Sequence, residues 1–358
     1  MSIQGISEPL TNGLIGCIDW LSWTFHINSD FTHKTAISFL GFDLSDFIEM
    51  SKGANGYRSM LTLNGHNIRI LYDGNENMGI HVDVSGSAIG ELLASWEQSK
   101  TISTPFGKGM YFDSLDDTLL LDLLKALTPI ATFTRVDLAI DDIGCKYYSC
   151  DDIVHLIENR QLISKFRGYD NKVPRSIHDG TKLGHTVYLG SGQSEIKLRI
   201  YDKRLEQLQK HDTDCGYEWV RWELELKRQR ANQAVILLIT HKSLSEVCIG
   251  ILSHYLRFII PDNENKSRCS TEPIWLEFIN AMKRMPLYIR SAPKNIDDTK
   301  RWVDECVGAS LCAIIEHDGG SLDFIYDNLP KWQMKRKFNR ELTARLHRSN
   351  KEEKIDGK

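Results

Sequence analysis

Three segments of the chain alternate between apolar and polar residues, which is the pattern of β-strands with one buried face. They cover residues 133–141, 197–203 and 219–227, and in all three the apolar positions are mainly the even-numbered ones. Because successive strand side chains point to opposite faces, the odd-numbered charged residues share the other face. An antiparallel sheet with one exposed face normally looks like this, so no single segment indicates a function by itself.

The rest of the chain mixes further strands with helices. Apolar runs predict strands at 16–27, 58–72, 79–85 and 185–190, and apolar periodicity predicts helices at 115–127, from 149, from 243, at 273–285 and at 297–316. Residues 166–184 read as a long loop or an irregular ribbon, and no internal repeat is evident. We therefore expect an α+β fold in which an antiparallel sheet carries the chemistry, helices flank it, and a helical C-terminal part and a basic tail follow.

Length and composition suggest several units. A chain of 358 residues is about twice a typical domain. We expect an N-terminal α+β part at 1–130, a catalytic part at 131–258, a helical part at 259–330 and a basic tail at 331–358.

The polar face of the first segment holds Arg135, Asp137 and Asp141. Two carboxylates four residues apart lie about 13 Å apart along a straight strand. Twist or a bulge would be needed for both to bind one ion.

The other two segments supply a tyrosine and more acids. Tyr201 lies between Arg199 and Lys203 on one strand face. Nearby cations favour the phenolate and can hold a phosphate, which predicts a nucleophile. The third segment places Arg221, Glu223, Glu225 and Lys227 together, and hard oxygen ligands of this kind suit Mg²⁺ or Mn²⁺. A tyrosine on a strand is more often simple packing, so the interpretation rests on the co-occurrence of the three faces.

Charge is distributed unevenly along the chain. The net charge of −4 and the pI near 6.3 exclude a uniformly basic nucleic-acid coat. Residues 331–358 nevertheless hold ten basic and four acidic side chains. The tail cations predicted to meet DNA are Lys335, Arg336, Lys337 and Arg340. A terminal helix docked on its own protein would fit this pattern equally well.

Cysteine spacing and hydropathy point to the cytoplasm. None of the eight cysteines forms a Cys-x-x-Cys pair, which argues against zinc ribbons and thioredoxin-like sites. We find no secretory signal and no apolar run of about 20 residues, so we expect no membrane partner.

Three segments carry a family resemblance: R-V-D-L-A-I-D-D (135–142), V-Y-L-G-S-G-Q-S-E-I-K-L-R-I-Y-D-K-R-L-E (187–206) and R-W-E-L-E-L-K (221–227). They resemble the Rep_trans replication initiators of staphylococcal-type plasmids and filamentous phages. Two further segments are similar to the filamentous-phage branch, which includes the cholera-toxin phage group. They are I-D-W-L-S-W-T-F (18–25) and G-I-H-V-D-V-S-G (79–86). The resemblance runs from about residue 15 to 230.

The resemblance implies a rolling-circle initiator of a bacterial host. Such an enzyme nicks one strand at the origin of supercoiled DNA, forms a 5′-phosphotyrosine intermediate and later rejoins the strand. By motif position the nucleophile is Tyr201. The implied metal ligands are Asp137 and Glu223, with Asp141 next and Glu225 left open. Arg135, Arg199, Lys203 and Arg221 would contact phosphate. The implied partners are double-stranded origin DNA, the displaced single strand, and a host helicase and polymerase.

Two rival interpretations stay open. The chain could be a non-catalytic origin-binding regulator that retains the initiator fold, or a metal-dependent nuclease that uses water as its nucleophile. Tyr188 and Tyr217 are the next candidate nucleophiles, in less charged surroundings. The twelve histidines contain no His-x-His pair, so the metal site of the His-hydrophobe-His initiators is not expected.

Overall fold

The computed structural model describes residues 13–26, 31–63, 67–102, 117–211, 214–241, 243–282, 300 and 308–335. Arg336, Lys337 and Arg340 of the predicted basic tail lie outside these residues, and of Lys335 only the helical backbone is described.

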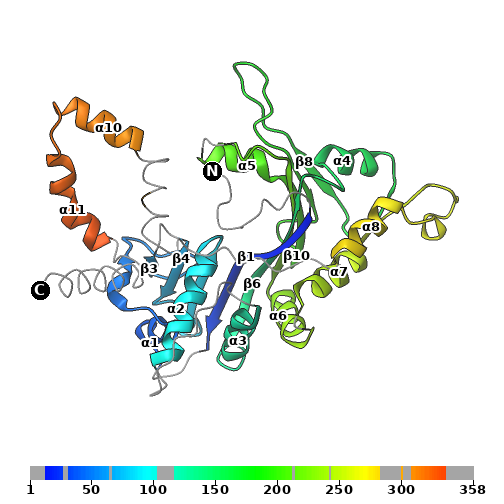
Figure 1. Cartoon of the computed structure of the whole chain (residues 1–358). Helices are drawn as coiled ribbons and strands as arrows, with labels where there is room; N and C mark the ends of the chain where they lie inside the picture. The colour runs from blue at the N-terminus through cyan, green and yellow to red at the C-terminus, as the bar shows by residue number, and fades with distance from the viewer. Residues whose placement is uncertain are drawn as a thin grey trace, which may run out of the picture.

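A ten-stranded antiparallel sheet runs through the molecule (Figure 1). Its order is β2-β3-β4-β5-β1-β6-β11-β10-β9-β8. The strands are β1 (Gly13–Phe25), β2 (Ile48–Glu49), β3 (Ser59–Leu63), β4 (Ile68–Tyr72), β5 (Ile80–Ser85), β6 (Ala131–Ile143), β8 (Tyr169–Lys172), β9 (Thr186–Leu189), β10 (Ile196–Asp202) and β11 (Trp219–Lys227). A separate pair joins β7 (Leu162–Ser164) to β12 (Leu256–Phe258). The predicted α+β class, with an antiparallel sheet and flanking helices, is confirmed.

The sheet repeats one arrangement about its centre. Reading outward from the central β1–β6 pair, one half runs β1-β5-β4-β3-β2 and the other runs β6-β11-β10-β9-β8. Each long central strand therefore pairs with the last strand of its own half, and a hairpin lies at each outer edge. Residues 1–130 and 131–258 thus contribute matching halves of a single sheet, although the sequence shows no evident repeat.

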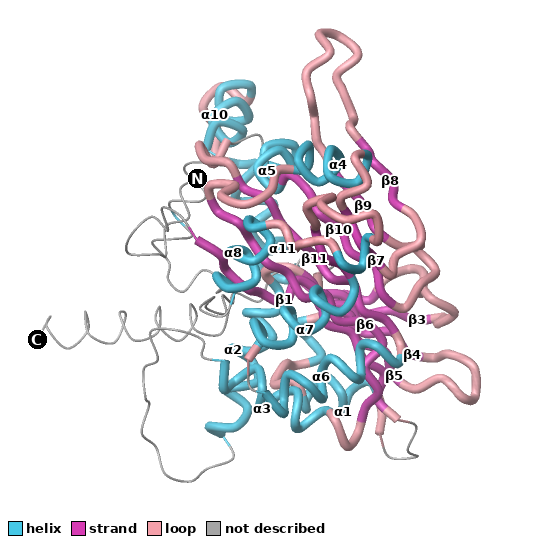
Figure 2. The backbone as a smooth tube through the Cα atoms, turned by 90° about the vertical axis from the view of Figure 1, so that its right-hand side faces the viewer, coloured by secondary structure: helices cyan, strands magenta, loops and turns pink. Residues whose placement is uncertain are grey.

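Helices cover the apolar face of the sheet (Figures 1 and 2). Helix α2 packs on β1 and β5, α6 packs on β6 and β11, and α7 packs on β1, while α3 packs against α2 and α6. The helices are α1 (His33–Phe39), α2 (Ala88–Ile102), α3 (Asp117–Leu127), α4 (Cys150–Glu158), α5 (Lys203–His211), α6 (Gln229–His241), α7 (Leu244–Tyr255), α8 (Pro273–Met282), α10 (Gly308–His317) and α11 (Asp323–Lys335). Among them no helix has the length and apolar character needed to cross a bilayer.

The even-numbered side chains of the three alternating strands form the core beneath these helices. Val136, Leu138, Leu198 and Trp222 are each fully buried. The indole of Trp222 packs on Phe278 of α8, with 4.9 Å between ring centroids. Burial of large apolar side chains is the main favourable contribution to folding, so this alternation fixes which strand face is left for the polar residues.

Several elements differ from the sequence expectation. The single strand predicted at 58–72 is the hairpin β3–β4. Of the two forms predicted for 166–184, a long loop or an irregular ribbon, the structure has the ribbon, which contains β8 and the bridge from Arg175 to Lys182. The strand predicted to reach Lys203 ends at Asp202, whose carboxylate accepts the Leu205 N–H at 2.9 Å and starts α5. Helices α5 and α6 were not predicted. The helix predicted from Ser149 is confirmed, because the Ser149 hydroxyl accepts the Asp152 N–H at 3.1 Å.

Candidate active site

Strands β6, β11 and β10 lie side by side and bring the predicted polar residues onto one face. In the register of β11 with β10, Glu223 is opposite Arg199 and Arg221 is opposite Tyr201. In the register of β11 with β6, Glu225 is opposite Asp137 and Arg221 is opposite Asp141. Cross-strand neighbours lie about 5 Å apart, so this register decides which acids and bases interact.

Tyr201, on β10, contacts both acidic and basic side chains of this face. Its hydroxyl donates to Glu223 Oε2 at 3.3 Å, and Lys203 Nζ donates to the same hydroxyl at 3.4 Å. The Arg199 guanidinium lies over the phenol ring, 4.5 Å from its centroid. The predicted association of the tyrosine with cations is present in the structure, with a carboxylate added to it.

The surroundings of Tyr201 differ from the solvated strand face that the sequence suggested. Its side chain is 4% exposed. Burial raises the pKa of Tyr201 well above its ordinary value, and the positive charges of Arg221 and Arg199 only partly offset this. The expectation that neighbouring cations would favour a free phenolate is therefore wrong for this arrangement, because desolvation has the larger effect.

Lys203 belongs to the first turn of α5 instead of the strand. It is buried, and its amine also forms an ion pair with Glu206 one helical turn away. Burial together with the nearby Arg221 lowers the pKa of Lys203, while Glu206 opposes that change. A helix that begins directly after the tyrosine strand thus delivers the amine to the phenol oxygen.

Glu223 joins the tyrosine to Arg199. Its carboxylate is 2% exposed, and one Arg199 nitrogen lies 2.8 Å and 2.6 Å from its two oxygens. The same carboxylate accepts the Tyr201 hydroxyl, so it is placed to take the phenolic proton.

Asp137 is held on the β6 side of this group. Arg135 donates to both of its oxygens, at 2.9 Å and 2.5 Å, and also pairs with Glu225 at 3.0 Å. Burial is the main reason that the pKa of Asp137 is raised to about 7. Hydrogen bonding to Arg135 and its charge oppose this rise, and the charges of Glu223 and Glu225 add to it. A cation beside this carboxylate would relieve that repulsion.

Asp141 takes part in a different interaction. Arg221 donates to its two oxygens at 2.6 Å and 2.7 Å, and to Asp19 Oδ1 at 2.5 Å. Arg221 is 1% exposed, so this buried guanidinium joins β11 to β6 and β1. Asp19, which sits at an irregularity in the β1–β6 register, was not predicted. An acid within the quoted I-D-W segment was its only sequence signal.

The acids fit a hard divalent cation by chemistry, but arginines hold them in this arrangement. Asp137, Glu223 and Asp141 each accept from a guanidinium. Within the described ranges no three His, Cys, Asp or Glu side chains gather as a set of metal ligands. The register separates Asp141 from Asp137 and places Glu223 opposite Ala139 between them. Carboxylate oxygens suit Mg²⁺ or Mn²⁺, and Glu223 is the acid of this set that contacts the Tyr201 hydroxyl.

The matching half of the sheet carries a related cluster that the sequence did not reveal. Arg69 on β4 is opposite Asp83 on β5 and donates to it at 2.8 Å, as Arg199 does to Glu223 in the other half. Asp83 also accepts from Ser22 at 2.5 Å and contacts His81 Nε2 at 3.2 Å. Leu71, instead of a tyrosine, is opposite His81. This half therefore has the ion pair but a leucine in place of the tyrosine.

An aromatic side chain links the two clusters across the centre of the sheet. The indole of Trp20 on β1 lies 4.2 Å from the Arg135 guanidinium and 5.8 Å from that of Arg69. Both arginines belong to the ion pairs just described. The polar face is thus continuous from β10 to β4.

The alternative tyrosines lie in other settings. Tyr188 on β9 is opposite Arg199, and the amines of Lys172 and Lys197 lie over its ring at 5.1 Å and 4.2 Å. Tyr217 packs against Trp219, with 6.2 Å between ring centroids. Two lysines thus surround Tyr188 and an indole packs on Tyr217, whereas the hydroxyl of Tyr201 contacts Glu223 and Lys203.

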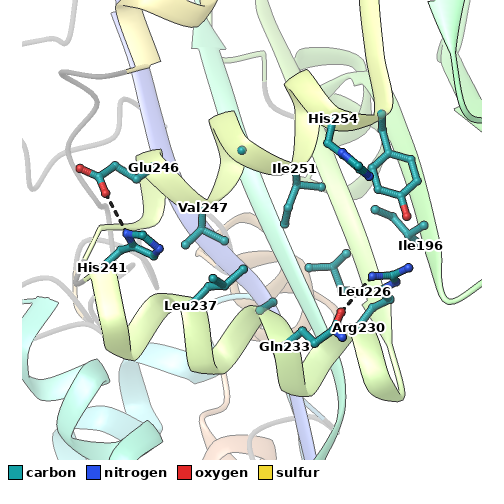
Figure 3. Close-up of a pocket in the computed structure, with 13 residues that line it drawn as sticks. Ile196, Leu226, Arg230, Gln233, Leu237, His241, Glu246, Val247, Ile251 and His254 are labelled. Atoms are coloured by element: carbon teal, nitrogen blue, oxygen red, sulfur yellow. Dashed lines mark hydrogen bonds and ion pairs between the residues drawn. The ribbon is translucent and has the colours of Figure 1, made fainter.

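A cavity of about 350 Å³ lies on the opposite, helix-covered face (Figure 3). Ile196 and Leu226 of the sheet form its floor, with α6 and α7 on either side, and an ion pair between His241 and Glu246 lies at one end. Because even-numbered strand residues point into it, this cavity is separated by the sheet from Tyr201.

Comparison with known proteins agrees with this geometry. The family model described as a replication initiation factor, Rep_trans, matches residues 131–328, which include β6, β10 and β11. This chain belongs to the Rep_trans family of replication initiation factors. The predicted family is therefore confirmed, while its filamentous-phage branch stays a prediction.

Two relatives extend the match beyond the family model. NicK of Bacillus subtilis (strain 168), a protein provisionally named a DNA relaxase, is 26% identical over 317 residues, 87% of this chain and 84% of NicK. The solved structure of a rolling-circle replication initiator protein from Geobacillus stearothermophilus superposes with a TM-score of 0.62 at 24% identity. It covers 78% of this chain and all of that one. The latter comparison shows that the Rep_trans chain shares the initiator fold.

Proposed function

We propose that this protein is a rolling-circle replication initiator that nicks one DNA strand at its origin and later rejoins it, with Tyr201 as the nucleophile. The observation that carries the proposal is the Tyr201 hydroxyl, which bonds to both Glu223 and Lys203. Membership of the replication initiation factor family and the relaxase name of NicK support DNA as the substrate.

The reaction follows from the contacts of the phenol. The Tyr201 oxygen attacks a phosphorus atom while its proton passes to Glu223 Oε2, 3.3 Å away. A bond forms between the tyrosine oxygen and phosphorus, and the bond from phosphorus to the 3′-oxygen breaks. The products are a 5′-phosphotyrosine and, once the departing oxygen takes up a proton, a 3′-hydroxyl. The reverse attack by a 3′-hydroxyl rejoins the strand.

The cations around the tyrosine stabilise the negative charge of the reacting phosphate. Arg199 and Lys203 lie next to the phenol, and Arg135 lies on the strand two positions across the sheet. Charge-assisted hydrogen bonds to phosphate are among the strongest available to a protein. All three nitrogens of the Arg221 guanidinium donate to Asp141 or Asp19, so we assign Arg221 to holding the strands in place.

We propose that Asp137 and Glu223 hold a Mg²⁺ or Mn²⁺ ion when DNA binds, with Glu225 adjacent. Such an ion would polarise the scissile phosphate. Asp141 is less suited, because both of its oxygens accept from Arg221.

The test is incubation with the supercoiled replicon that encodes the chain, in Mg²⁺ or Mn²⁺. We expect an open circle with protein attached to the 5′ end, and loss of both nick and adduct in Tyr201→Phe. The matched control is Tyr188→Phe, which removes a hydroxyl from the adjacent strand and should keep the adduct. A nick without attached protein would favour a water-using nuclease, and binding without any nick would favour the regulator.

A further inference from the structure

A long projection extends from the sheet beside the active site. Strands β8 and β9 pair from Tyr169–Leu189 to Lys172–Thr186, and a further bridge joins Arg175 to Lys182. Residues 173–185, here called the projecting loop, rise well beyond the neighbouring helices α4 and α5 in both views (Figures 1 and 2).

The tip of the projecting loop is held by its own hydrogen bonds. The Ser176 N–H donates to the Thr181 carbonyl at 2.8 Å, and the Gly180 N–H donates to the Ser176 carbonyl at 3.0 Å. The Arg175 guanidinium donates to the Gly180 carbonyl at 3.1 Å. Gly180 has a φ of +75°, which favours glycine at the turn. The tip is thus a defined turn.

The base of the projecting loop is braced against α4. His185 is buried, and its Nε2 lies 2.8 Å from Asn171 Oδ1 in the opposite arm. Lys182 forms an ion pair with Asp151 of α4 at 3.0 Å, and His185 Nδ1 lies 3.5 Å from the same carboxylate. These contacts hold the two arms together and fix their direction relative to the sheet.

An apolar side chain stands at the end of this projection. Ile177 is 99% exposed. Single exposed apolar residues are common and need no explanation by themselves. Ile177 differs because it sits at the tip of an ordered, braced turn, where it makes no contribution to the protein's own core.

The projecting loop and its arms are positively charged. Residues 165–184 contain five basic and two acidic side chains. Lys172 and Arg175 lie on the arm that leads to the tip and Lys182 on the arm that returns. Positive charge around an apolar tip matches a nucleic acid, whose phosphates surround a stack of apolar base faces.

The returning arm leads directly to the nucleophile. Thr186 at the end of this arm is opposite Tyr201 in the register of β9 with β10, and the His185 carbonyl accepts the Asp202 N–H at 3.0 Å. Thr186 lies nine positions after Ile177 in the chain, so the tip lies at most about 30 Å from the tyrosine strand. A duplex bound at the active site would pass within reach of the tip.

We infer that the projecting loop is a wedge for double-stranded DNA, in which Ile177 inserts into the base stack next to the nick site while Lys172 and Arg175 contact phosphates. This inference rests on the proposed nicking function. Tyr201 is recessed, at 4% exposure, and a separated strand can enter a recess that a duplex cannot. Inserted aliphatic side chains unstack and kink DNA in this manner.

The test compares two substrates. Once the nick is mapped, the full chain is given a relaxed linear duplex or a single-stranded oligonucleotide spanning the nick. We expect Ile177→Ser to lower cleavage of the duplex about tenfold or more relative to cleavage of the single strand, and Ile177→Leu to restore the ratio. The matched control is Ile236→Ser, which changes an isoleucine of α6 that is 55% exposed. It should leave the ratio unchanged.

Strand opening can be measured without chemistry. Permanganate oxidises unstacked thymines, so it reports opening of the supercoiled replicon by the Tyr201→Phe protein. We expect reactive thymines near the origin with Ile177 and their loss with Ile177→Ser. The wedge proposal would be overturned if Ile177→Ser left the ratio of duplex to single-strand cleavage equal to that of the wild type. It would also be overturned if Ile177→Ser left the permanganate pattern unchanged. If the wild-type chain leaves the supercoiled replicon uncut, the nicking function fails, and the permanganate pattern still decides whether the projecting loop opens DNA.

Discussion

The Tyr201 hydroxyl donates to Glu223 on the neighbouring strand, 3.3 Å away, and Arg199 binds both oxygens of that carboxylate. Because burial raises the pKa of Tyr201, little phenolate forms spontaneously near neutral pH. A base in contact with the phenol can remove its proton during the attack, when the oxygen becomes bonded to phosphorus. Glu223 is the carboxylate in that position.

Glu223→Gln should therefore abolish most of the nicking. The amide keeps the size of the side chain but cannot take up the phenolic proton, and general-base catalysis typically contributes 10²- to 10⁴-fold. We expect the single-turnover rate of adduct formation to fall at least about 100-fold while DNA affinity changes little. The measurement is rapid-quench kinetics with a gel that separates the adduct.

Glu225→Gln is the matched control for this prediction. Glu225 lies two residues along the same face and pairs with Arg135 and Lys227, away from the phenol. Glu225→Gln should lower the rate of adduct formation far less than Glu223→Gln does. Equal losses for the two variants would assign the effect to the overall charge of the face and remove Glu223 from the role of base.

Removal of divalent metal should stop the nicking. If Asp137 and Glu223 hold the ion, EDTA abolishes adduct formation, and added Mg²⁺ or Mn²⁺ restores it. Asp137→Asn should raise the half-saturating metal concentration about tenfold or more, since the variant lacks a charged oxygen ligand. Asp141→Asn should change it less, because Arg221 already holds both oxygens of Asp141. Full activity in EDTA would contradict the metal proposal.

Arg221 should be important for stability. It is 1% exposed and pairs with Asp141 and Asp19. Arg221→Met leaves two carboxylates without their cation, and such a loss at a buried pair costs about 3–5 kcal/mol. The free energy of unfolding in urea measures this cost.

Arg204→Met provides the comparison. Arg204 also pairs with two carboxylates, Asp214 and Glu218, but its side chain is 30% exposed. Solvent-exposed pairs contribute about 1 kcal/mol or less. If both variants lose the same stability, burial does not govern the contribution of Arg221.

The sequence could predict which residues share a face of the sheet, but not which of them contact one another. Alternation along β6, β10 and β11 placed Arg135, Tyr201 and Glu223 on one side of a sheet, as the structure has them. Arg199 and Glu223 lie 24 residues apart in the chain, and their pairing requires the register between two strands, which depends on the whole sheet. The raised pKa of Tyr201 could not be predicted from the sequence for a related reason, because it depends on burial by residues distant in the chain.

Local signals that were present account for part of what was missed. Asp202 caps α5, and a cap residue after a strand could have ended the predicted strand before Lys203. By contrast, nothing local connects Asp83 with Glu223. Only the matching order of the two half-sheets relates the Arg69–Asp83 pair to the Arg199–Glu223 pair.

Asp83 leads to a prediction about acid stability. Burial raises the pKa of Asp83, but hydrogen bonds from His81 and Ser22 and the charges of His81 and Arg69 outweigh this and bring it to about 2. The folded protein therefore holds the ionised form more tightly than the unfolded chain does. The resulting stability is fully present above about pH 4 and is lost as the pH falls toward 2.

Asp83→Asn should destabilise the protein by about 2–3 kcal/mol at neutral pH, because a carboxylate in this environment contributes roughly that much. The difference between wild type and variant should shrink as the pH falls from 4 toward 2, since the wild-type carboxylate then takes up a proton. Urea unfolding midpoints measured between pH 2 and pH 4 give this difference in stability. The hydrogen bond from Arg58 also lowers the pKa of Asp73, but this pair is exposed to solvent, so Asp73→Asn should show a much smaller pH-dependent difference. A difference for Asp83→Asn that stays constant down to pH 2 would show that packing, and not charge, is what the carboxylate supplies.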